Sequence, residues 1–326
     1  MKIAIGTNIF SEYPRQTLAI ESLKILKEMV KSLDVQIDLY NIQFEDNTIE
    51  IDGFTNLNVL KNSNLTIKEE IIKSSGYFNG CVECNGIDNN VPFSPKVLPL
   101  MNELFDALGN LIDYDYVIFT NSDIMISNRL IIEILETKKE SYCVSRLDIQ
   151  HINSLTDKII PIKIEVAGFD TYVFKPNWWQ ENKHRFPKYL LGKTRWDNNY
   201  TSIFMTHSDS KLLNYYPGHI LHIFHGYGSH QDDMETRYVG KLWDLRPGLQ
   251  GGWGTYFDRI LMKRTHHNGV SLANKNDFED ELTTNIFKLT KQIDDGEVNG
   301  LLPMLTNPDK LEMHIKIKEY INQNTQ

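Results

Sequence analysis

The amino-terminal segment has the pattern of a β-α-β unit. Residues Lys2–Ile5 form a short apolar run, and residues 35–39 alternate apolar with polar, which is typical of strands. Between them, a polar loop from Gly6 to Pro14 leads into a helical stripe of apolar residues from about Arg15 to Ser32. This order predicts an α/β fold whose sheet is covered by helices.

Apolar periodicity predicts further elements along the chain. Ser94 and Pro95 are the residue types of a helix N-cap and a first helical position, so we expect a helix from there to Leu108. Tyr116–Phe119 predicts a central strand, which residues 120–123 interrupt and residues 124–126 resume. Other strands are expected near residues 57–60, 142–145, 159–164, 171–174 and 220–224, and other helices near 67–74, 127–135, 197–205, 277–293 and 308–321.

Charge and composition narrow the class of protein. The formal net charge is −9, which argues against a chain built to hold nucleic acid. Three cysteines are not a disulfide framework, and the pair Cys81 and Cys84 has no second pair to complete a zinc site. No segment resembles a signal peptide or a transmembrane helix. We therefore expect a cytoplasmic protein, which would lie at a membrane surface if the molecule on which it acts is lipid-linked.

The triplet Asn121-Ser122-Asp123 carries the strongest signal for chemistry. It stands at the carboxyl end of a predicted buried strand, where ligands gather in open α/β sheets. Alternate residues of a strand share a face, so Asn121 and Asp123 would point at one ligand. A carboxylate there suits a hard divalent cation that bridges two phosphates. A solvated aspartate that ends a strand is the alternative.

In this order of elements, the sequence resembles the GT-A glycosyltransferases, over about residues 1–230. That family has a DxD-like triplet after an apolar strand, and Asn121 replaces its usual first aspartate. The resemblance implies a GT-A-like, Rossmann-type mixed sheet flanked by helices. It implies a catalytic domain at 1–270, with a nucleotide-donor half at 1–126 and an acceptor half at 127–270. Residues 271–326 would form a helical extension.

The resemblance also implies donor-site residues. Asp123 would bind Mn²⁺ or Mg²⁺, and Asn121 and Ser122 would lie against the donor ribose or sugar. The loop after the first strand would contact the nucleotide through Thr7, Asn8 and Ile9. Lys96, at the start of a predicted helix, would reach the diphosphate, although a solvated lysine is the alternative.

The second half of the chain contains the expected acceptor and base residues. Asp170 would hydrogen-bond a sugar hydroxyl, and Trp196 would contact the acceptor, although a tryptophan more often packs in a core. Asp197 would be the general base of an inverting transfer. Because it stands at a predicted helix start, a role as N-cap is the alternative.

Histidines gather between His219 and His230, and two of them are candidates for the cation site. The resemblance implies that one histidine beyond the core strands completes the metal shell, with His225 as first choice and His222 as second. On a strand, these two side chains would face opposite sides, so a preformed cluster of three histidines is not expected. Structural histidines held by local hydrogen bonds are the alternative.

The resulting prediction is a metal-dependent glycosyltransferase of polysaccharide or surface-glycan biosynthesis. A UDP- or GDP-sugar would be the donor, and a glycan or lipid-linked hydroxyl the acceptor. Two alternatives stay open: a sugar-phosphate nucleotidyltransferase, and a non-catalytic glycan- or nucleotide-binding protein of the same fold. Dinucleotide-binding and P-loop glycine motifs are absent from the sequence, which argues against dehydrogenases and P-loop NTPases.

Overall fold

The structure is a computed structural model of the 326-residue chain. It describes residues 1–10, 14–47, 49–61, 97–157, 159–193, 196–205, 209–213, 219–225, 233 and 235–239. The helices predicted near residues 67–74, 277–293 and 308–321, and the extension 271–326 to which the last two belong, lie outside the described residues. Within the described part of the chain, no helix combines the length and apolar character needed to cross a bilayer.

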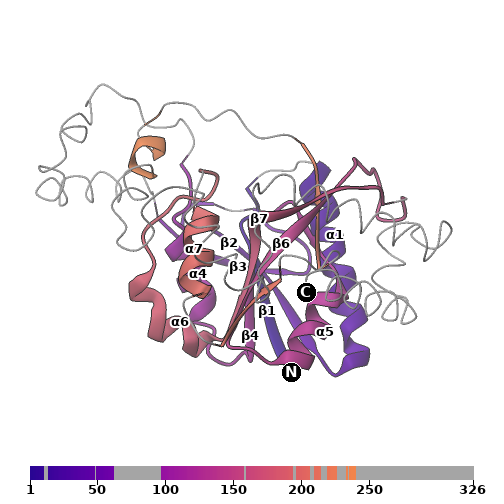
Figure 1. The fold of residues 1–326 in the computed structure, drawn as a ribbon, viewed down its shortest axis with the longest axis horizontal. Helices are drawn as coiled ribbons and strands as arrows, with labels where there is room; N and C mark the ends of the chain where they lie inside the picture. The colour runs from indigo at the N-terminus through magenta and orange to yellow at the C-terminus, as the bar shows by residue number, and fades with distance from the viewer. Residues whose placement is uncertain are drawn as a thin grey trace, which may run out of the picture.

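A mixed sheet forms the centre of the described structure (Figure 1). Its strands are β1 (Lys2–Thr7), β2 (Gln36–Phe44), β3 (Phe54–Leu60), β4 (Tyr116–Thr120), β5 (Ile124–Ile126), β6 (Ser141–Ile149), β7 (Pro161–Phe174), β8 (Ser210–Leu213) and β9 (Ile220–Ile223). The order is β3-β2-β1-β4-β7-β6-β9-β5, with β8 paired to β6. β7 runs antiparallel to β4 and β6, and β5 runs antiparallel to β9. The predicted α/β fold with a mixed sheet is therefore confirmed.

Helices cover both faces of this sheet. They are α1 (Pro14–Met29), α4 (Met101–Gly109), α5 (Asn128–Thr137), α6 (Pro176–Asn182) and α7 (Trp196–Met205), with 3-10 turns at Val30–Leu33 and Lys183–Arg185. Figure 1 shows α4, α6 and α7 on one face and α1 and α5 on the other. Because each face is buried, the central strand β4 is apolar over Tyr116–Phe119, as that run predicts.

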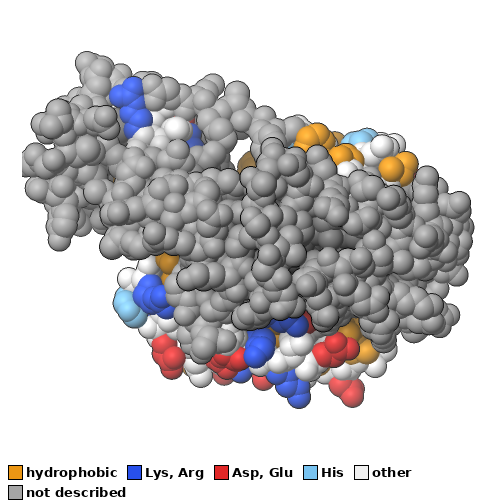
Figure 2. Space-filling model, viewed as in Figure 1, with side chains coloured by type: hydrophobic (Ala, Val, Ile, Leu, Met, Phe, Trp, Pro, Cys, Tyr) orange, Lys and Arg blue, Asp and Glu red, His pale blue; other side chains and the backbone are white. Residues whose placement is uncertain are grey.

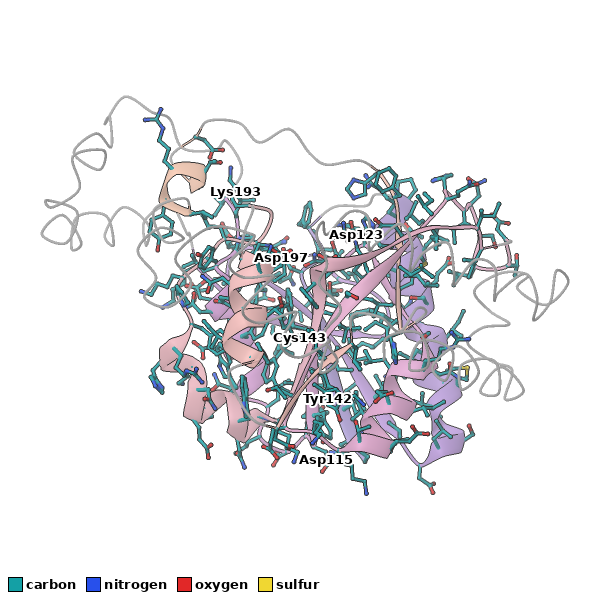
Figure 3. The ribbon with its side chains drawn as sticks, viewed as in Figure 1. Asp115, Asp123, Tyr142, Cys143, Lys193 and Asp197 are labelled. Carbon is teal, nitrogen blue, oxygen red and sulfur yellow. The ribbon has the colours of Figure 1, made fainter. Side chains whose placement is uncertain are left out.

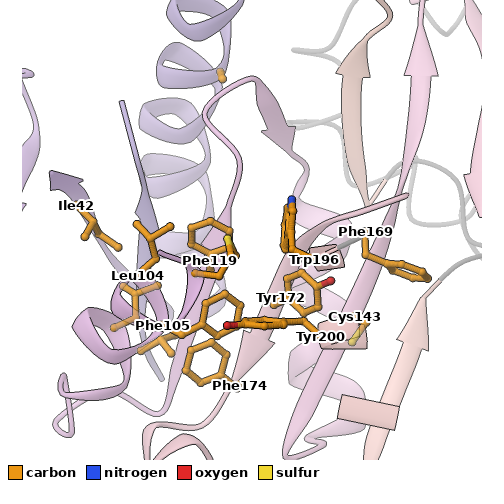
Figure 4. Close-up of a cluster of buried hydrophobic side chains, with 14 of the residues drawn as sticks. Ile42, Leu104, Phe105, Phe119, Cys143, Phe169, Tyr172, Phe174, Trp196 and Tyr200 are labelled. Carbon is orange, nitrogen blue, oxygen red and sulfur yellow. The ribbon is translucent and has the colours of Figure 1, made fainter. Parts of the chain in front are cut away.

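Two hydrophobic cores result from this layering. The core under α4, α6 and α7 is aromatic: the ring of Phe105 stacks on Phe174 at a centroid distance of 5.2 Å and contacts Tyr200 (Figure 4). The same ring also contacts Trp179. Fully burying a side chain of this size contributes about 1.5–3 kcal/mol. The second core is mostly aliphatic, with Tyr116 and Tyr142 as its aromatic members, and lies under α1 and α5.

The helix predicted from Ser94 begins later than expected. Residues 97–99 are not helical, and Leu100 is extended, with φ −78° and ψ 131°, before α4 begins at Met101. Pro99 disfavours the α conformation of Leu98, so a helix from Ser94 is not expected to continue through residue 98. The backbone N–H of Met101 instead donates to the carbonyl of Tyr189 at 2.8 Å. The prediction overlooked this second proline.

Three strand predictions need correction. β5 does not resume β4: a turn at residues 121–123 separates them, and β5 pairs with β9 at one end of the strand order, whereas β4 lies between β1 and β7. The two strands expected at residues 159–164 and 171–174 are one strand, β7, because irregular pairing with β6 around Ser145 accommodates the residues between them. In addition, α6 and β8 were not predicted.

Candidate metal and donor site

Candidate side chains gather at the carboxyl edge of the parallel strands. β1, β2, β4, β6 and β9 run in one direction, so their carboxyl ends meet at this edge. Figure 3 shows Asp123 and Asp197 at the same end of the sheet, whereas Asp115, which precedes β4, lies at the opposite end. Asp123 follows β4 by three residues, so the predicted position at the strand's carboxyl end is correct.

Asn121, Ser122 and Asp123 form a turn between β4 and β5. The N–H of Ile124 donates to the carbonyl of Asn121 at 3.2 Å, which closes the turn. Because the triplet is not a strand, the prediction that Asn121 and Asp123 share a strand face is wrong. Asn121 Nδ2 donates to Asp170 Oδ1 at 2.7 Å. Ser122 Oγ accepts from Gln16 Nε2 of α1 at 2.9 Å.

Asp123 contacts the two histidines that the sequence singled out. Its Oδ2 lies 3.6 Å from His222 Nε2 and 3.5 Å from His225 Nε2. Possible ligand atoms of the three residues lie within 4.8 Å of one another. The expectation that the histidines face opposite sides is wrong, because β9 ends at Ile223 and His225 follows outside the strand. Their ring centroids are 4.9 Å apart.

Strong electrostatic interactions couple the residues of this cluster. Burial alone would raise the pKa of Asp123, but hydrogen bonds and charge from His222 and His225 outweigh it and hold that pKa well below its usual range. Burial lowers the pKa of His222, whereas Asp123 and Asp148 raise it to about 9. The carboxylate is therefore ionised, and a cation would have to displace the proton of His222 before two imidazole nitrogens and one carboxylate could hold it.

Two further residues of the site were not predicted. Asp148 Oδ1 lies 2.8 Å from His222 Nδ1, and Arg146 Nε donates to the same oxygen at 2.9 Å. Arg146 Nη1 also pairs with Asp170. A charged network thus joins the histidines to the residue that holds Asn121. Its only sequence signal is the alternation of Arg146 and Asp148 in an apolar strand, where a charge is rarely buried without a partner.

Asp197 lies in the first turn of α7 and is partly buried. Burial and the negative charge of Asp170 raise its pKa to about 7, against the opposing effects of Asn198 and Arg146. It is the second residue of the helix, and its Oδ1 accepts from the side chain of Asn198 at 2.9 Å. This geometry differs from that of an N-cap, which precedes the first helical residue.

Trp196 lies in the aromatic core. It is 5% exposed, and its ring lies within 6.4 Å, between centroids, of Phe119, Tyr172 and Tyr200 (Figure 4). A sugar could stack on it only after these contacts were broken. The position therefore favours the packing alternative over acceptor binding.

The first loop is buried beside unpaired polar atoms. Thr7, Asn8 and Ile9 are at most 3% exposed. Asn8 Nδ2 donates to the carbonyl of Ile42 at 2.7 Å, and the N–H of Ile9 donates to Asn41 Oδ1 at 3.0 Å. Among the described residues, four buried side-chain atoms here have no hydrogen-bond partner: Thr7 Oγ1, Gln16 Oε1, Asn41 Nδ2 and Asn121 Oδ1. Buried polar atoms are normally paired, so this group indicates a polar ligand or water.

Other candidates of the sequence have different outcomes. Lys96 and the pair Cys81 and Cys84 lie outside the described residues. Cys143 is fully buried in β6, which is typical of an inert thiol. In the part of this face that described residues form, Figure 2 shows acidic and basic side chains interspersed along one margin.

Comparison with known proteins gives structural likenesses only. No protein-family model matches the sequence, and no curated protein matches it. The chain is similar to TarS 1–349 from S. aureus in complex with UDP-GlcNAc, with a TM-score of 0.38 and 13% identity, over 99% of this chain and 92% of that one. It is also similar to the apo glycosyltransferase GlyE of Streptococcus pneumoniae TIGR4, with a TM-score of 0.31 and 13% identity, over 80% of this chain and 63% of that one.

A third similar structure is the galactosyltransferase LgtC in complex with donor and acceptor sugar analogues. Its TM-score is 0.30 and its identity 10%, over 74% of this chain and 94% of that one. GlyE is a glycosyltransferase and LgtC a galactosyltransferase. All three TM-scores are below 0.5, so these likenesses carry no argument about function.

Proposed function

We propose that the protein is a metal-dependent glycosyltransferase. It would transfer a sugar from a UDP- or GDP-sugar to a hydroxyl group of a glycan or lipid-linked acceptor. One observation carries this proposal: a carboxylate and two imidazoles converge at the carboxyl edge of the sheet, at the same end as a second carboxylate with a raised pKa. The first group suits a cation that holds a diphosphate, and the second suits a general base.

The residues present fit a divalent cation. Asp123, His222 and His225 would hold it, and the two imidazole nitrogens favour Mn²⁺ over Mg²⁺, which prefers an all-oxygen shell. When bound, the cation would neutralise the charge that develops on the leaving diphosphate. The three residues supply only part of a coordination shell, which leaves positions for phosphate oxygens.

Asp197 is the proposed base. In its ionised form it would accept the proton of the acceptor hydroxyl as that oxygen attacks the anomeric carbon, which inverts the configuration there. Its pKa of about 7 suits this task, because a general base works best when its pKa lies near the working pH. Asp170 raises this pKa and also accepts a hydrogen bond from Asn121. It would therefore act on both the proposed base and the proposed donor site.

The cation site would join the two halves of the catalytic domain. Asp123 belongs to the proposed donor half, residues 1–126, whereas His222 and His225 belong to the acceptor half, within residues 127–270. The antiparallel pairing of β5 with β9 brings them together, with Ile124 opposite His222. Residues 1–270 are the proposed catalytic domain, and residues 271–326 are the proposed extension that follows it.

A panel of nucleotides with and without Mn²⁺ tests the function directly. Thermal unfolding would be measured with UDP, GDP, CMP and dTDP, and released nucleoside diphosphate would then be assayed with the matching sugar donor and candidate acceptors. A ligand at about 100 times its Kd stabilises by about 2.7 kcal/mol. We expect one diphosphate to stabilise the protein only with Mn²⁺. No shift under any condition would favour a different kind of ligand, and binding without turnover would favour a non-catalytic protein.

Thr7→Val tests the donor role of the first loop. The substitution removes a buried hydroxyl that has no partner among the described residues, and leaving such a group unpaired costs about 1–3 kcal/mol. We therefore expect unchanged or higher stability without ligand, but weaker binding of the stabilising nucleotide. Calorimetry and thermal unfolding measure the two effects separately.

Ser141→Ala is the matched control for Thr7→Val. Ser141 is buried at the start of β6, where its hydroxyl pairs with that of Ser210 at 2.5 Å. Losing this bond should lower stability by about 0.5–1.5 kcal/mol without changing nucleotide affinity. Thr7→Val with lower stability and full nucleotide affinity would contradict the donor role.

A further inference from the structure

His222 is held on both sides of its ring. Nε2 faces Asp123 Oδ2 at 3.6 Å, and Nδ1 lies 2.8 Å from Asp148 Oδ1. Because a carboxylate oxygen only accepts, Nδ1 must carry the proton in that contact. The other nitrogen is thereby directed into the cluster with Asp123 and His225.

Asp148 occupies this position through the register of two strands. β6 and β9 pair in parallel, and Asp148 is the direct partner of His222. Its side chain is 0% exposed, so the carboxylate would be costly to bury without positive or hydrogen-bonding neighbours. Arg146 and His222 both supply such contacts to Oδ1.

We propose that Asp148 is a positioning residue for the cation site. It accepts the Nδ1 proton of His222, fixes the orientation of the ring, and presents Nε2 as a ligand. This inference rests on the proposed function, because the cation site is part of that proposal. Carboxylates that accept from a ligating histidine commonly raise its basicity and prevent it from rotating.

Arg146 extends the same support to the rest of the site. It donates to Asp148 at 2.9 Å and pairs with Asp170, which in turn accepts from Asn121 in the turn that carries Asp123. The side chain of Arg146 is 15% exposed, so solvent screens these charges little. One network therefore contacts both His222 and the turn that carries Asp123.

Mn²⁺ affinity of Asp148 variants tests this role. Mn²⁺ alone would be titrated into the wild-type protein, Asp148→Asn and Asp148→Ala, and followed by calorimetry. Loss of a carboxylate of this kind commonly weakens metal binding about 10–100-fold, which we expect for Asp148→Ala. Asp148→Asn should lose less, because its amide oxygen can still accept from both His222 and Arg146.

Glu133→Gln is the matched control. Glu133 is a buried acid of α5, 1% exposed, that pairs with Lys211 and does not belong to the cation cluster. We expect this variant to lower the free energy of unfolding without changing Mn²⁺ affinity. If Asp148→Ala does not fold, Asp148→Asn decides, because it keeps the acceptor but loses the negative charge that raises the basicity of His222. Weaker Mn²⁺ binding by Asp148→Asn than by the wild type then supports the positioning role, and unchanged affinity overturns it.

The outcomes separate this inference from the function on which it rests. A wild-type protein that binds no Mn²⁺ would overturn the cation site and the positioning role together. If the wild-type protein binds Mn²⁺ and both Asp148 variants bind it equally well, only the positioning role is overturned. A graded loss from aspartate to asparagine to alanine, with Glu133→Gln unchanged, supports it.

Discussion

Asp123→Ala is expected to abolish the Mn²⁺-dependent stabilisation by a nucleoside diphosphate and to lower kcat/KM by roughly a thousandfold or more. Asp123 is the one carboxylate of the proposed cation cluster, so its loss leaves only two imidazoles to hold the cation. A cation on a leaving diphosphate contributes several kcal/mol to the transition state, and about 4 kcal/mol corresponds to a thousandfold in rate. Steady-state kinetics and thermal unfolding with Mn²⁺ measure the two effects.

Asp115→Ala is the control for this prediction. Asp115 is exposed at the opposite end of β4, where it accepts from the backbone N–H of Lys2 at 2.7 Å (Figure 3). Its substitution should leave both Mn²⁺-dependent effects intact. An Asp123→Ala protein that kept wild-type turnover would show that the cation, if the enzyme uses one, is held elsewhere.

Asp197→Asn is expected to lower kcat by roughly a hundred- to ten-thousandfold, the usual contribution of a general base. The wild-type rate should rise with pH through about 7, the pKa of this carboxyl, because only the ionised form can accept a proton. The variant should lose that rise. Asp170 and Arg146 are the charged groups that act on this pKa, so their substitution would shift the midpoint of the profile.

The same substitution should not destabilise the fold, which separates a catalytic from a structural role. The pKa of Asp197 is raised from 3.8 to about 7, so the folded state binds more protons than the unfolded state between these values. This carboxyl therefore lowers stability as pH rises from about 4 to about 7. At pH 8, Asp197→Asn should be at least as stable as the wild type. A less stable variant with near-normal kcat would contradict the proposed base.

The local pattern of apolar and polar residues was sufficient to predict a buried sheet covered by helices. The apolar run Tyr116–Phe119 predicts a strand buried on both faces, and the structure buries each of these residues. Periodicity also predicts α1, because its apolar positions form one stripe facing the sheet. The later start of α4 was readable as well, since Pro99 is a local signal.

The composition of the site was only partly predictable. Asp123 is recognisable because a polar turn after a buried strand lies at the carboxyl edge, whatever the remaining topology. His222 and His225 were candidates only through a family resemblance. The alternation of side chains along a strand predicted that they would face opposite sides. Their convergence depends on where β9 ends, and strand ends are set by pairing with β6 and β5 rather than by local composition.

By itself, the sequence determined the alternation of strands and helices, the burial of the sheet and the place of Asp123 at its edge, because these follow from short-range periodicity. Only the tertiary structure decided that Asp148 supports His222, that Arg146 links Asp148 to Asp170, and that Trp196 packs in the core. Those contacts join segments far apart in the chain. Strand register and helix packing create them, and neither can be derived from the residues on one strand alone.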